Sequence, residues 1–187
     1  DACPRDDLPE VAIAGRSNAG KSSVLNQLAD NRQLARTSKT PGRTQLLNFF
    51  TVRGGGRIVD LPGYGYARVS KSAKAQWQDN VEAYLAGRPN LVALVLVMDI
   101  RHPFEAFDRQ IAAWSRAANL PLHVLLNKAD KLGRAAQQDA LRTAEKTLAT
   151  LAAPGQASAQ VFSATTGLGR DALIARLEAW LRMPPAR

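Results

Sequence analysis

The stretch that most constrains this chain is residues 15–22, GRSNAGKS, which stands between an apolar run and a segment with helical periodicity. The apolar run at 11–14 has the character of a buried strand, and residues 23–28 have that of a helix. Two glycines allow the intervening loop to wrap closely around a polyphosphate. Backbone N–H groups and the positive end of the following helix then point at the phosphate oxygens.

Residues 15–22 therefore have the composition of a phosphate-binding loop. Its candidate ligands are Gly15, Arg16, Ser17, Asn18, Ala19, Gly20, Lys21 and Ser22. Lys21 would contact the β and γ oxygens and assist catalysis, and the Ser22 hydroxyl would bind Mg²⁺. The alternative is a glycine-rich turn with an incidental lysine, which would not require a strand before it and a helix after it. The loop in its context predicts a P-loop nucleotide-binding fold.

Strand-like and helix-like segments alternate along the chain. Strands are expected at 11–14, 45–52, 57–60, 91–98, 120–126 and 159–162, and helices at 23–28, 74–86, 104–117, 135–151 and 171–181. Glycines 54–56 indicate a tight turn, so one strand should run antiparallel to the rest. The polar segment 30–43 lacks apolar periodicity and is expected to be a loop. The prediction is an α/β fold with a six-stranded, mostly parallel sheet and helices on both faces.

The composition limits the possible classes of protein. A chain of 187 residues, 45% of them hydrophobic, suits one domain. The longest apolar run, 91–98, is too short to span a bilayer, and the first residues lack the pattern of a secretion signal. Cys3 is the only cysteine, which excludes an internal disulfide and argues against a zinc site. These features fit a protein of a reducing compartment that does not contact the membrane.

The net charge of +9 is concentrated in one segment. Residues 31–75 contain nine basic residues and one acidic residue, whereas the remainder is nearly balanced. The nine are Arg32, Arg36, Lys39, Arg43, Arg53, Arg57, Arg68, Lys71 and Lys74. Such a concentration is typical of a surface that binds a polyanion, above all nucleic acid. A set of solvated loops would be equally compatible with the charge alone.

A second motif, Asp60-Leu61-Pro62-Gly63, ends the strand predicted at 57–60. The Asp60 carboxylate can reach the coordination shell of Mg²⁺, directly or through water. Gly63 leaves a bare backbone N–H that can approach a γ-phosphate. A DxxG tetrad alone is a common turn, but its position at a strand end after a phosphate loop indicates a nucleotide-binding role.

A third motif, Asn127-Lys128-Ala129-Asp130, ends another buried strand. Guanine presents N1–H and an N2 amine side by side, and the Asp130 carboxylate can accept from both, whereas adenine has no such pair. Lys128 can lay its stem along the base, and Asn127 can tie this loop to the phosphate loop. A helix-start signal is the alternative. After the last strand, Phe162-Ser163-Ala164 can offer the Ala164 N–H to guanine O6.

These motifs occur in the order found in the translational-type small GTPases. SKTPGRTQ at 38–45 and DLPGYGYA at 60–67 closely resemble the EngB group, and the resemblance extends from about residue 8 to 181. It implies a small G-domain over residues 1–187, with a short N-terminal extension at 1–9. It also implies a bacterial cytoplasmic GTPase that converts GTP to GDP and phosphate, assists assembly of the large ribosomal subunit and supports cell division and septation.

The resemblance also assigns a segment that the residues leave open. From the sequence alone Thr37, Thr40 and Thr44 are all candidates to face the metal, and the resemblance selects Thr44, which would also act in catalysis. With Ser22 and Asp60 it would complete the Mg²⁺ site. The nucleotide-binding residues implied here are Gly42, Arg43, Thr44, Gln45 and Leu46. We expect a monomer, because no coiled-coil heptad is present.

One position departs from the Ras-like pattern. Tyr64 follows DxxG where those proteins have a glutamine that orients the attacking water, so unaided hydrolysis should be slow. Asn18 matches relatives that use potassium, and our hypothesis is that it helps to hold K⁺ against the phosphates and so acts in catalysis. The alternative is that Asn18 only stabilises the loop through side-chain hydrogen bonds.

The basic segment 31–75 spans both predicted switch loops, which suggests a mechanism. GTP would order its cations into a surface for rRNA of the large ribosomal subunit or its precursor, and GDP would disperse them. Two other classes share some of these features. A nucleoside kinase would have the phosphate loop but no use for NKAD. A septin-type scaffold that hardly hydrolyses GTP would fit Tyr64.

Overall fold

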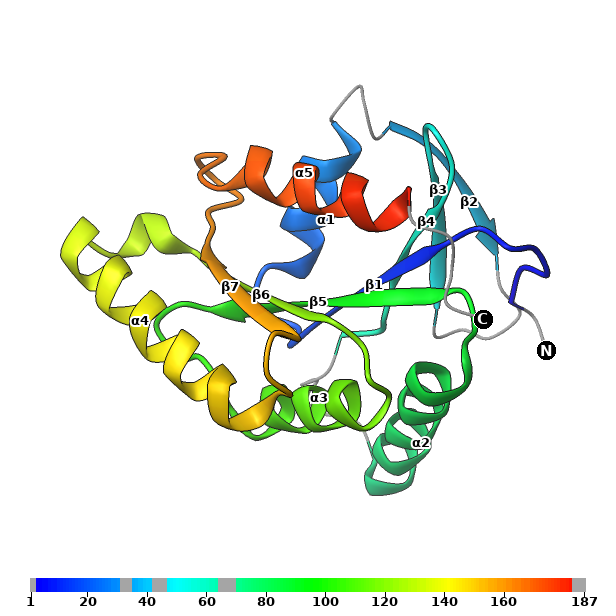
Figure 1. The fold of residues 1–187 in the computed structure, drawn as a ribbon, viewed down its shortest axis with the longest axis horizontal. Coiled ribbons are helices and arrows are strands. Elements are labelled where there is room, and N and C mark those ends of the chain that lie inside the picture. The colour runs from blue at the N-terminus through cyan, green and yellow to red at the C-terminus, as the bar shows by residue number, and fades with distance from the viewer. Residues whose placement is uncertain (1–2, 31–34, 42–46, 64–69, 183–187) are drawn as a thin grey trace.

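The computed structural model describes residues 3–30, 35–41, 47–63 and 70–182, which form one seven-stranded sheet (Figure 1). The strands are β1 Glu10–Gly15, β2 Ala35–Pro41, β3 Asn48–Val52, β4 Arg57–Asp60, β5 Leu91–Asp99, β6 Leu122–Asn127 and β7 Ala157–Val161. The helices are α1 Lys21–Ala29, α2 Lys71–Gly87, α3 Ala106–Ala117, α4 Arg134–Leu151 and α5 Arg170–Leu181, with the 3-10 turn η1 Ala129–Lys131.

The strand order is β2-β3-β4-β1-β5-β6-β7. β3 is antiparallel to both of its neighbours, and the remaining pairs are parallel. The predicted α/β fold, mostly parallel with one antiparallel strand and with helices on both faces, is therefore confirmed.

The sheet has one strand more than predicted, because β2 forms where the sequence suggested a loop. Its polar sequence ARTSKTP has no apolar periodicity. It pairs with β3 through the backbone, with Lys39 opposite Phe50 and Pro41 opposite Asn48. An edge strand needs only one hydrogen-bonded neighbour and tolerates proline, so a polar segment can occupy this place.

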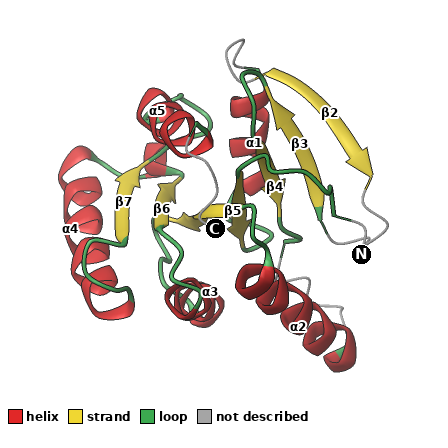
Figure 2. Ribbon diagram, turned by 45° about the vertical axis from the view of Figure 1, so that its right-hand side comes forward, coloured by secondary structure: helices red, strands yellow, loops and turns green. Residues whose placement is uncertain are grey.

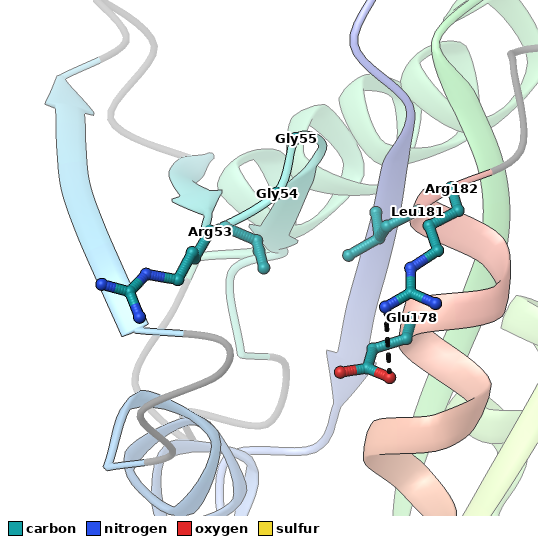
Figure 3. A pocket seen from close by; sticks show the side chains of 7 residues that line it. Arg53, Gly54, Gly55, Glu178, Leu181 and Arg182 are labelled. Atoms are coloured by element: carbon teal, nitrogen blue, oxygen red, sulfur yellow. Dashed lines mark ion pairs between the residues drawn. The ribbon is translucent and has the colours of Figure 1, made fainter.

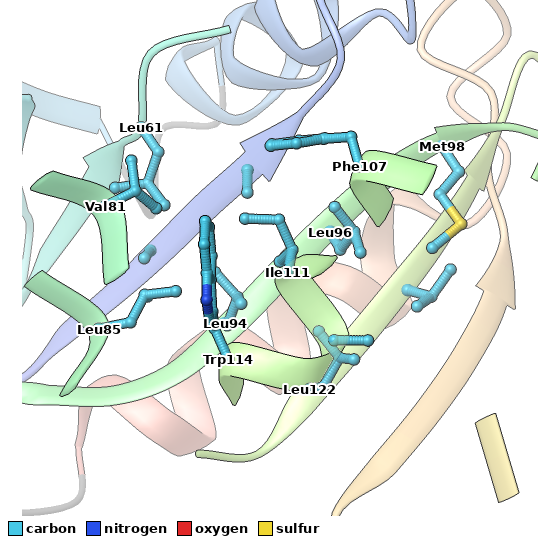
Figure 4. Close-up of a cluster of buried hydrophobic side chains, with 14 of the residues drawn as sticks. Leu61, Val81, Leu85, Leu94, Leu96, Met98, Phe107, Ile111, Trp114 and Leu122 are labelled. Atoms are coloured by element: carbon cyan, nitrogen blue, oxygen red, sulfur yellow. The ribbon is translucent and has the colours of Figure 1, made fainter. Parts of the chain in front are cut away.

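Helices cover the two faces of the sheet unequally. α1 and α5 lie on one face, and α2, α3 and α4 lie on the other (Figures 1 and 2). β5 is buried between them and contributes alternate residues to each side. Leu94, Leu96 and Met98 pack toward α2 and α3 (Figure 4), whereas Val95 and Val97 belong to the core beneath α1 and α5. This two-sided burial explains the continuous apolar run at 91–98.

A buried charge cluster joins the N-terminal segment to the amino ends of the strands. Glu10, with no exposed surface, accepts hydrogen bonds from Arg88 Nε at 2.8 Å, Arg88 Nη2 at 2.7 Å and the Tyr84 hydroxyl at 3.2 Å. Arg57 pairs with Asp6 and lies 3.5 Å from Glu10, and the bond to Asp6 raises the pKa of Arg57. Arg57 is thus buried in ion pairs and does not belong to a basic surface.

None of the helices in the described ranges combines the length and the apolar composition needed to cross a bilayer.

Candidate nucleotide-binding site

The loop between β1 and α1 is held closely against its neighbours. Gly20 has φ +92°, and a Cβ at this position would lie 2.4 Å from Asn127 Nδ2. A Cβ on Gly15 would lie 2.9 Å from the Val97 carbonyl oxygen. Only glycine meets these requirements without movement of the backbone or of a buried amide. The compact turn that results directs the start of α1 toward the carboxyl ends of the strands.

The Lys21 side chain connects this loop to the DxxG segment. Lys21 is 7% exposed, and its ammonium donates to the Asp60 carboxylate and to the Leu61 carbonyl. Parallel pairing of β1 with β4 places Ile13 opposite Asp60, which brings the two strand ends together. A Cβ built on Gly63 would lie 3.6 Å from Ser17 Cα, so the end of this segment also adjoins the phosphate loop.

Asn127 links three loops at the end of β6. It is 2% exposed, and its Nδ2 donates to the Ala19 carbonyl at 2.9 Å. Its Oδ1 accepts from Ala164 N at 3.1 Å. The predicted donor to guanine O6, the Ala164 N–H, is therefore already engaged and would have to be shared with the base. Because its amide is used between loops, Asn127 does not act as a helix cap.

Lys128 and Asp130 project from the same loop. Lys128 has φ +64°, and its ammonium donates to the Asn18 carbonyl at 2.5 Å. Asp130 Oδ1 accepts from Ser163 Oγ at 2.6 Å, and this bond holds the pKa of Asp130 below its usual value. Asp130 is therefore an anion at neutral pH, as recognition of paired N–H donors requires. Ala129 and Phe162 are buried and joined by a backbone bond, Ala129 N to Phe162 O at 3.1 Å.

Three carboxylates around these loops, Asp99, Glu105 and Asp108, are absent from the residues predicted from sequence. Asp99 ends β5 and lies 3.4 Å from Lys128 Nζ. Arg16 Nη1 lies 3.4 Å from Glu105 Oε1, at the start of α3, and Asp108 is buried in the first turn of that helix. One signal was available: a carboxylate that ends a long apolar strand lies at the edge where ligands bind in such folds.

The donor set around Lys21 suits a hard divalent cation. Ser22 is exposed on the first turn of α1, and the Asp60 carboxylate lies beside the phosphate loop. Hydroxyl and carboxylate oxygens are ligands that Mg²⁺ prefers. The described ranges contain no cluster of three His, Cys, Asp or Glu side chains able to hold a metal, so nucleotide oxygens would have to complete the coordination. Thr44 and its neighbours Gly42, Arg43, Gln45 and Leu46, as well as Tyr64, lie outside the described residues.

A hollow of about 380 Å³ lies near the amino ends of the parallel strands, away from the loops described above, between the β3–β4 turn and the end of α5 (Figure 3). It is lined by Val52, Arg53, Gly54, Gly55, Glu178, Leu181 and Arg182. Within it Arg182 pairs with Glu178 at 3.8 Å. None of the predicted nucleotide-binding residues lines this hollow. Polar groups converge instead at the carboxyl edge, which is therefore the candidate nucleotide-binding site.

Comparison with known proteins gives a consistent result. Residues 10–128 match a family described as 50S ribosome-binding GTPase. A protein of Vibrio parahaemolyticus named "Probable GTP-binding protein EngB" is 49% identical over 177 residues, covering 95% of this chain and 80% of the relative. A protein of the same name from Francisella tularensis is also 49% identical, covering 95% and 90%.

Solved structures agree on the fold. A crystal structure of a probable GTP-binding protein EngB has a TM-score of 0.71 at 22% identity and covers 92% of this chain and 98% of its own. A variant of Aquifex aeolicus Era bound to GDP·AlF4⁻ has a TM-score of 0.65 at 21% identity, covering 97% and 62%. The sequence match over nearly the whole chain and the loop geometry agree: this chain belongs to the EngB family of GTP-binding proteins, which are GTPases.

Proposed function

We propose that this EngB-family GTPase acts as a GTP-controlled switch in assembly of the large ribosomal subunit. The main support for guanine nucleotide binding is the hydrogen bond from Asn127 to the Ala19 carbonyl. It fixes the loop that bears the ionised Asp130 against the phosphate loop. The ribosomal part is supported by the description of the matched family and by the concentration of charge at residues 31–75.

In this proposal each loop has a separate task. Asp130 accepts from guanine N1–H and N2–H, and residues 15–22 surround the phosphates. Lys21 exchanges its contacts to Asp60 and Leu61 O for the β and γ oxygens, and the Gly63 N–H approaches the γ-phosphate. Mg²⁺ held by Ser22, Thr44 and Asp60 would neutralise charge on the phosphate oxygens. Intrinsic hydrolysis is slow, because Tyr64 cannot orient water as glutamine does.

The proposed partner is rRNA of the large subunit or its precursor. Lys71 and Lys74 are exposed on the first turn of α2, directly after the segment 64–69. A cationic surface that depends on nucleotide should release RNA both on hydrolysis and on addition of salt. The place of action would be the cytoplasm, where ribosomal subunits are assembled.

Co-sedimentation with ribosomal subunits tests this proposal. We expect binding with a non-hydrolysable GTP analogue, weaker binding with GDP, and a steep loss as salt rises. Lys71→Glu with Lys74→Glu should weaken the GTP-dependent binding. Lys146→Glu, an exposed charge reversal on α4, is the control. Binding that ignores nucleotide and salt would contradict the proposal.

We also propose that Asn18 helps to hold K⁺ during hydrolysis. Its side chain is exposed, and in the described part of the chain it makes no hydrogen bond that would favour a purely loop-stabilising role. Turnover should be faster in KCl than in NaCl, and Asn18→Ala should abolish the difference. Equal rates in the two salts would refute this role.

The EngB resemblance further leads us to propose a requirement in cell division and septation. Depletion should cause accumulation of a large-subunit precursor before filamentous cells appear. Filaments that form while subunit profiles stay normal would separate the two roles.

A further inference from the structure

Asp99, the last residue of β5, holds several donors at once. Its Oδ1 accepts from the Arg101 backbone N–H at 2.9 Å and from Arg101 Nε at 3.0 Å. Its Oδ2 accepts from Arg101 Nη2 at 2.8 Å and lies 3.4 Å from Lys128 Nζ. The hydrogen bonds from Arg101 hold the pKa of Asp99 far below its usual value. Asp99 is therefore a fixed anion, braced by one arginine.

Lys128 is held from two sides. Its ammonium lies between Asp99 and the Asn18 carbonyl, which belongs to the phosphate loop. The backbone beneath it is also fixed, because Ile100 N donates to Asn127 O at 2.9 Å. The stem of Lys128 must therefore bridge the base loop and the phosphate loop along one path.

We propose that Asp99 is a positioning residue for nucleotide binding, which holds the Lys128 ammonium so that the lysine stem forms a preset shelf for the purine ring. This inference rests on the proposed role of residues 127–130 in guanine recognition. Without Asp99 the ammonium would keep only the Asn18 carbonyl and solvent, and the stem would sample several rotamers. Ordering it again on binding would weaken affinity.

The two acidic residues near the base then have separable effects. A shelf contacts the face of any purine, so loss of Asp99 should weaken guanine and hypoxanthine nucleotides by the same factor. Asp130 accepts from N1–H and N2–H at the ring edge, so its loss should change the ratio between bases.

The test is stopped-flow kinetics with fluorescent GDP and IDP. Asp99→Asn should raise koff for both by about tenfold and leave kon nearly unchanged, since affinity changes in one site appear mainly in koff. Asp139→Asn is the matched control, because Asp139 also pairs with an arginine, Arg142, but on the exposed face of α4.

A double-mutant cycle separates positioning from general stability. Lys128→Met removes the ammonium but keeps a stem, and it should raise koff by a similar factor. Asp99→Asn should add nothing in that background. The positioning role would be overturned if Asp99→Asn raised koff in the Lys128→Met background by as much as it does in the wild-type background. It would also be overturned if Asp99→Asn alone released nucleotide at the wild-type rate. If Asp99→Asn does not fold, a wild-type koff for Lys128→Met overturns it instead.

The same data distinguish failure of the proposed base recognition from failure of the positioning role of Asp99 alone. If wild type fails to prefer guanine nucleotides, or Asp130→Asn leaves that preference intact, the proposed base recognition itself fails and the inference fails with it. If guanine preference depends on Asp130 while Asp99→Asn binds as wild type does, only the positioning role is lost.

Discussion

Two buried carboxylates at opposite edges of the sheet are partnered in different ways. Glu10, at the amino edge, uses both oxygens, with Arg88 bonded to each of them and Tyr84 to one. Asp108, at the carboxyl edge, is 1% exposed, and its Oδ2 accepts from Glu105 N at 3.0 Å. Its Oδ1 has no hydrogen-bond partner among the described residues. Burial raises the pKa of Asp108 to about 6.

This difference distinguishes the amino edge, where charged groups stabilise the fold, from the carboxyl edge, where charged groups are available to a ligand. The amino edge joins the N-terminal segment to the sheet through a closed network, in which Glu10 is paired with two arginines. At the carboxyl edge, charged groups such as Lys21, Asp60 and Asp130 lie where a ligand can take over their contacts. Stability is therefore expected to depend on the first edge and ligand binding on the second. Four experiments test this division, in order of decreasing expected effect.

The largest effect should follow Glu10→Ala. Removal of the carboxylate takes a buried partner from both Arg57 and Arg88, and breaking a buried ion pair in this way typically costs about 3–5 kcal/mol. Urea unfolding should show this loss, while GDP affinity of the folded protein stays unchanged. Glu145→Ala, an exposed position on α4, is the control. A matching loss of GDP affinity would show that the two edges are coupled.

Asp130→Asn should give the converse result. Guanine nucleotide affinity should fall on the order of 100-fold, about 2.7 kcal/mol, because the carboxylate proposed to accept two N–H bonds becomes an amide. Xanthine nucleotides, which present a carbonyl in place of the N2 amine, should bind better than to wild type. Thermal unfolding without ligand should barely change. Calorimetry with GDP and XDP measures the shift.

His123, the second residue of β6, tests a buried position near the amino ends of the strands. Burial lowers its pKa to about 4. The unfolded chain, with a pKa near 6.5, takes up the proton first, so stability should fall as pH drops from about 6.5 to 4, with about 2 kcal/mol lost by pH 5. His123→Gln should flatten this slope in urea unfolding at pH 7 and pH 5. An unchanged slope would assign the pH dependence to other groups.

The smallest effect should come from Asp108→Asn. Because the pKa of Asp108 is raised, its ionised form destabilises the fold above about pH 6, and this penalty disappears as pH falls toward 3.8. Asparagine keeps an acceptor for Glu105 N without the charge. A gain of about 1 kcal/mol is expected at pH 8, since the helix N-terminus offsets part of the penalty. No gain should remain at pH 4.

The candidate nucleotide-binding loops could be proposed from sequence because each is a motif of consecutive residues. Glycines at 15 and 20, a lysine before a serine, and a carboxylate at the end of a buried strand are recognisable without the fold, although their contacts with Val97, Asn127 and Asp60 are not. The strand ends were also predictable from apolar runs, which placed β5 within one residue of its observed end.

The remainder depends on contacts between distant segments. Arg57 looks like part of a basic surface until Asp6 and Glu10, more than 40 residues earlier, bury it. β2 pairs with the backbone of β3, although its sequence has no apolar periodicity that would predict a strand. Asp99 acquires a role only when Lys128 is brought beside it by the pairing of β5 with β6. Such partners carry no periodic signal along the chain.

The contact between Gly20 and Asn127 has a consequence for how such a chain can change over time. Any side chain at position 20 would displace an amide that lies more than 100 residues further on. The segment proposed to bind the phosphates and the segment proposed to recognise the base therefore cannot change independently at this contact. They must be inherited as one unit, and a descendant that acquires a new preferred nucleotide has to obtain it at the ring edge without disturbing this junction.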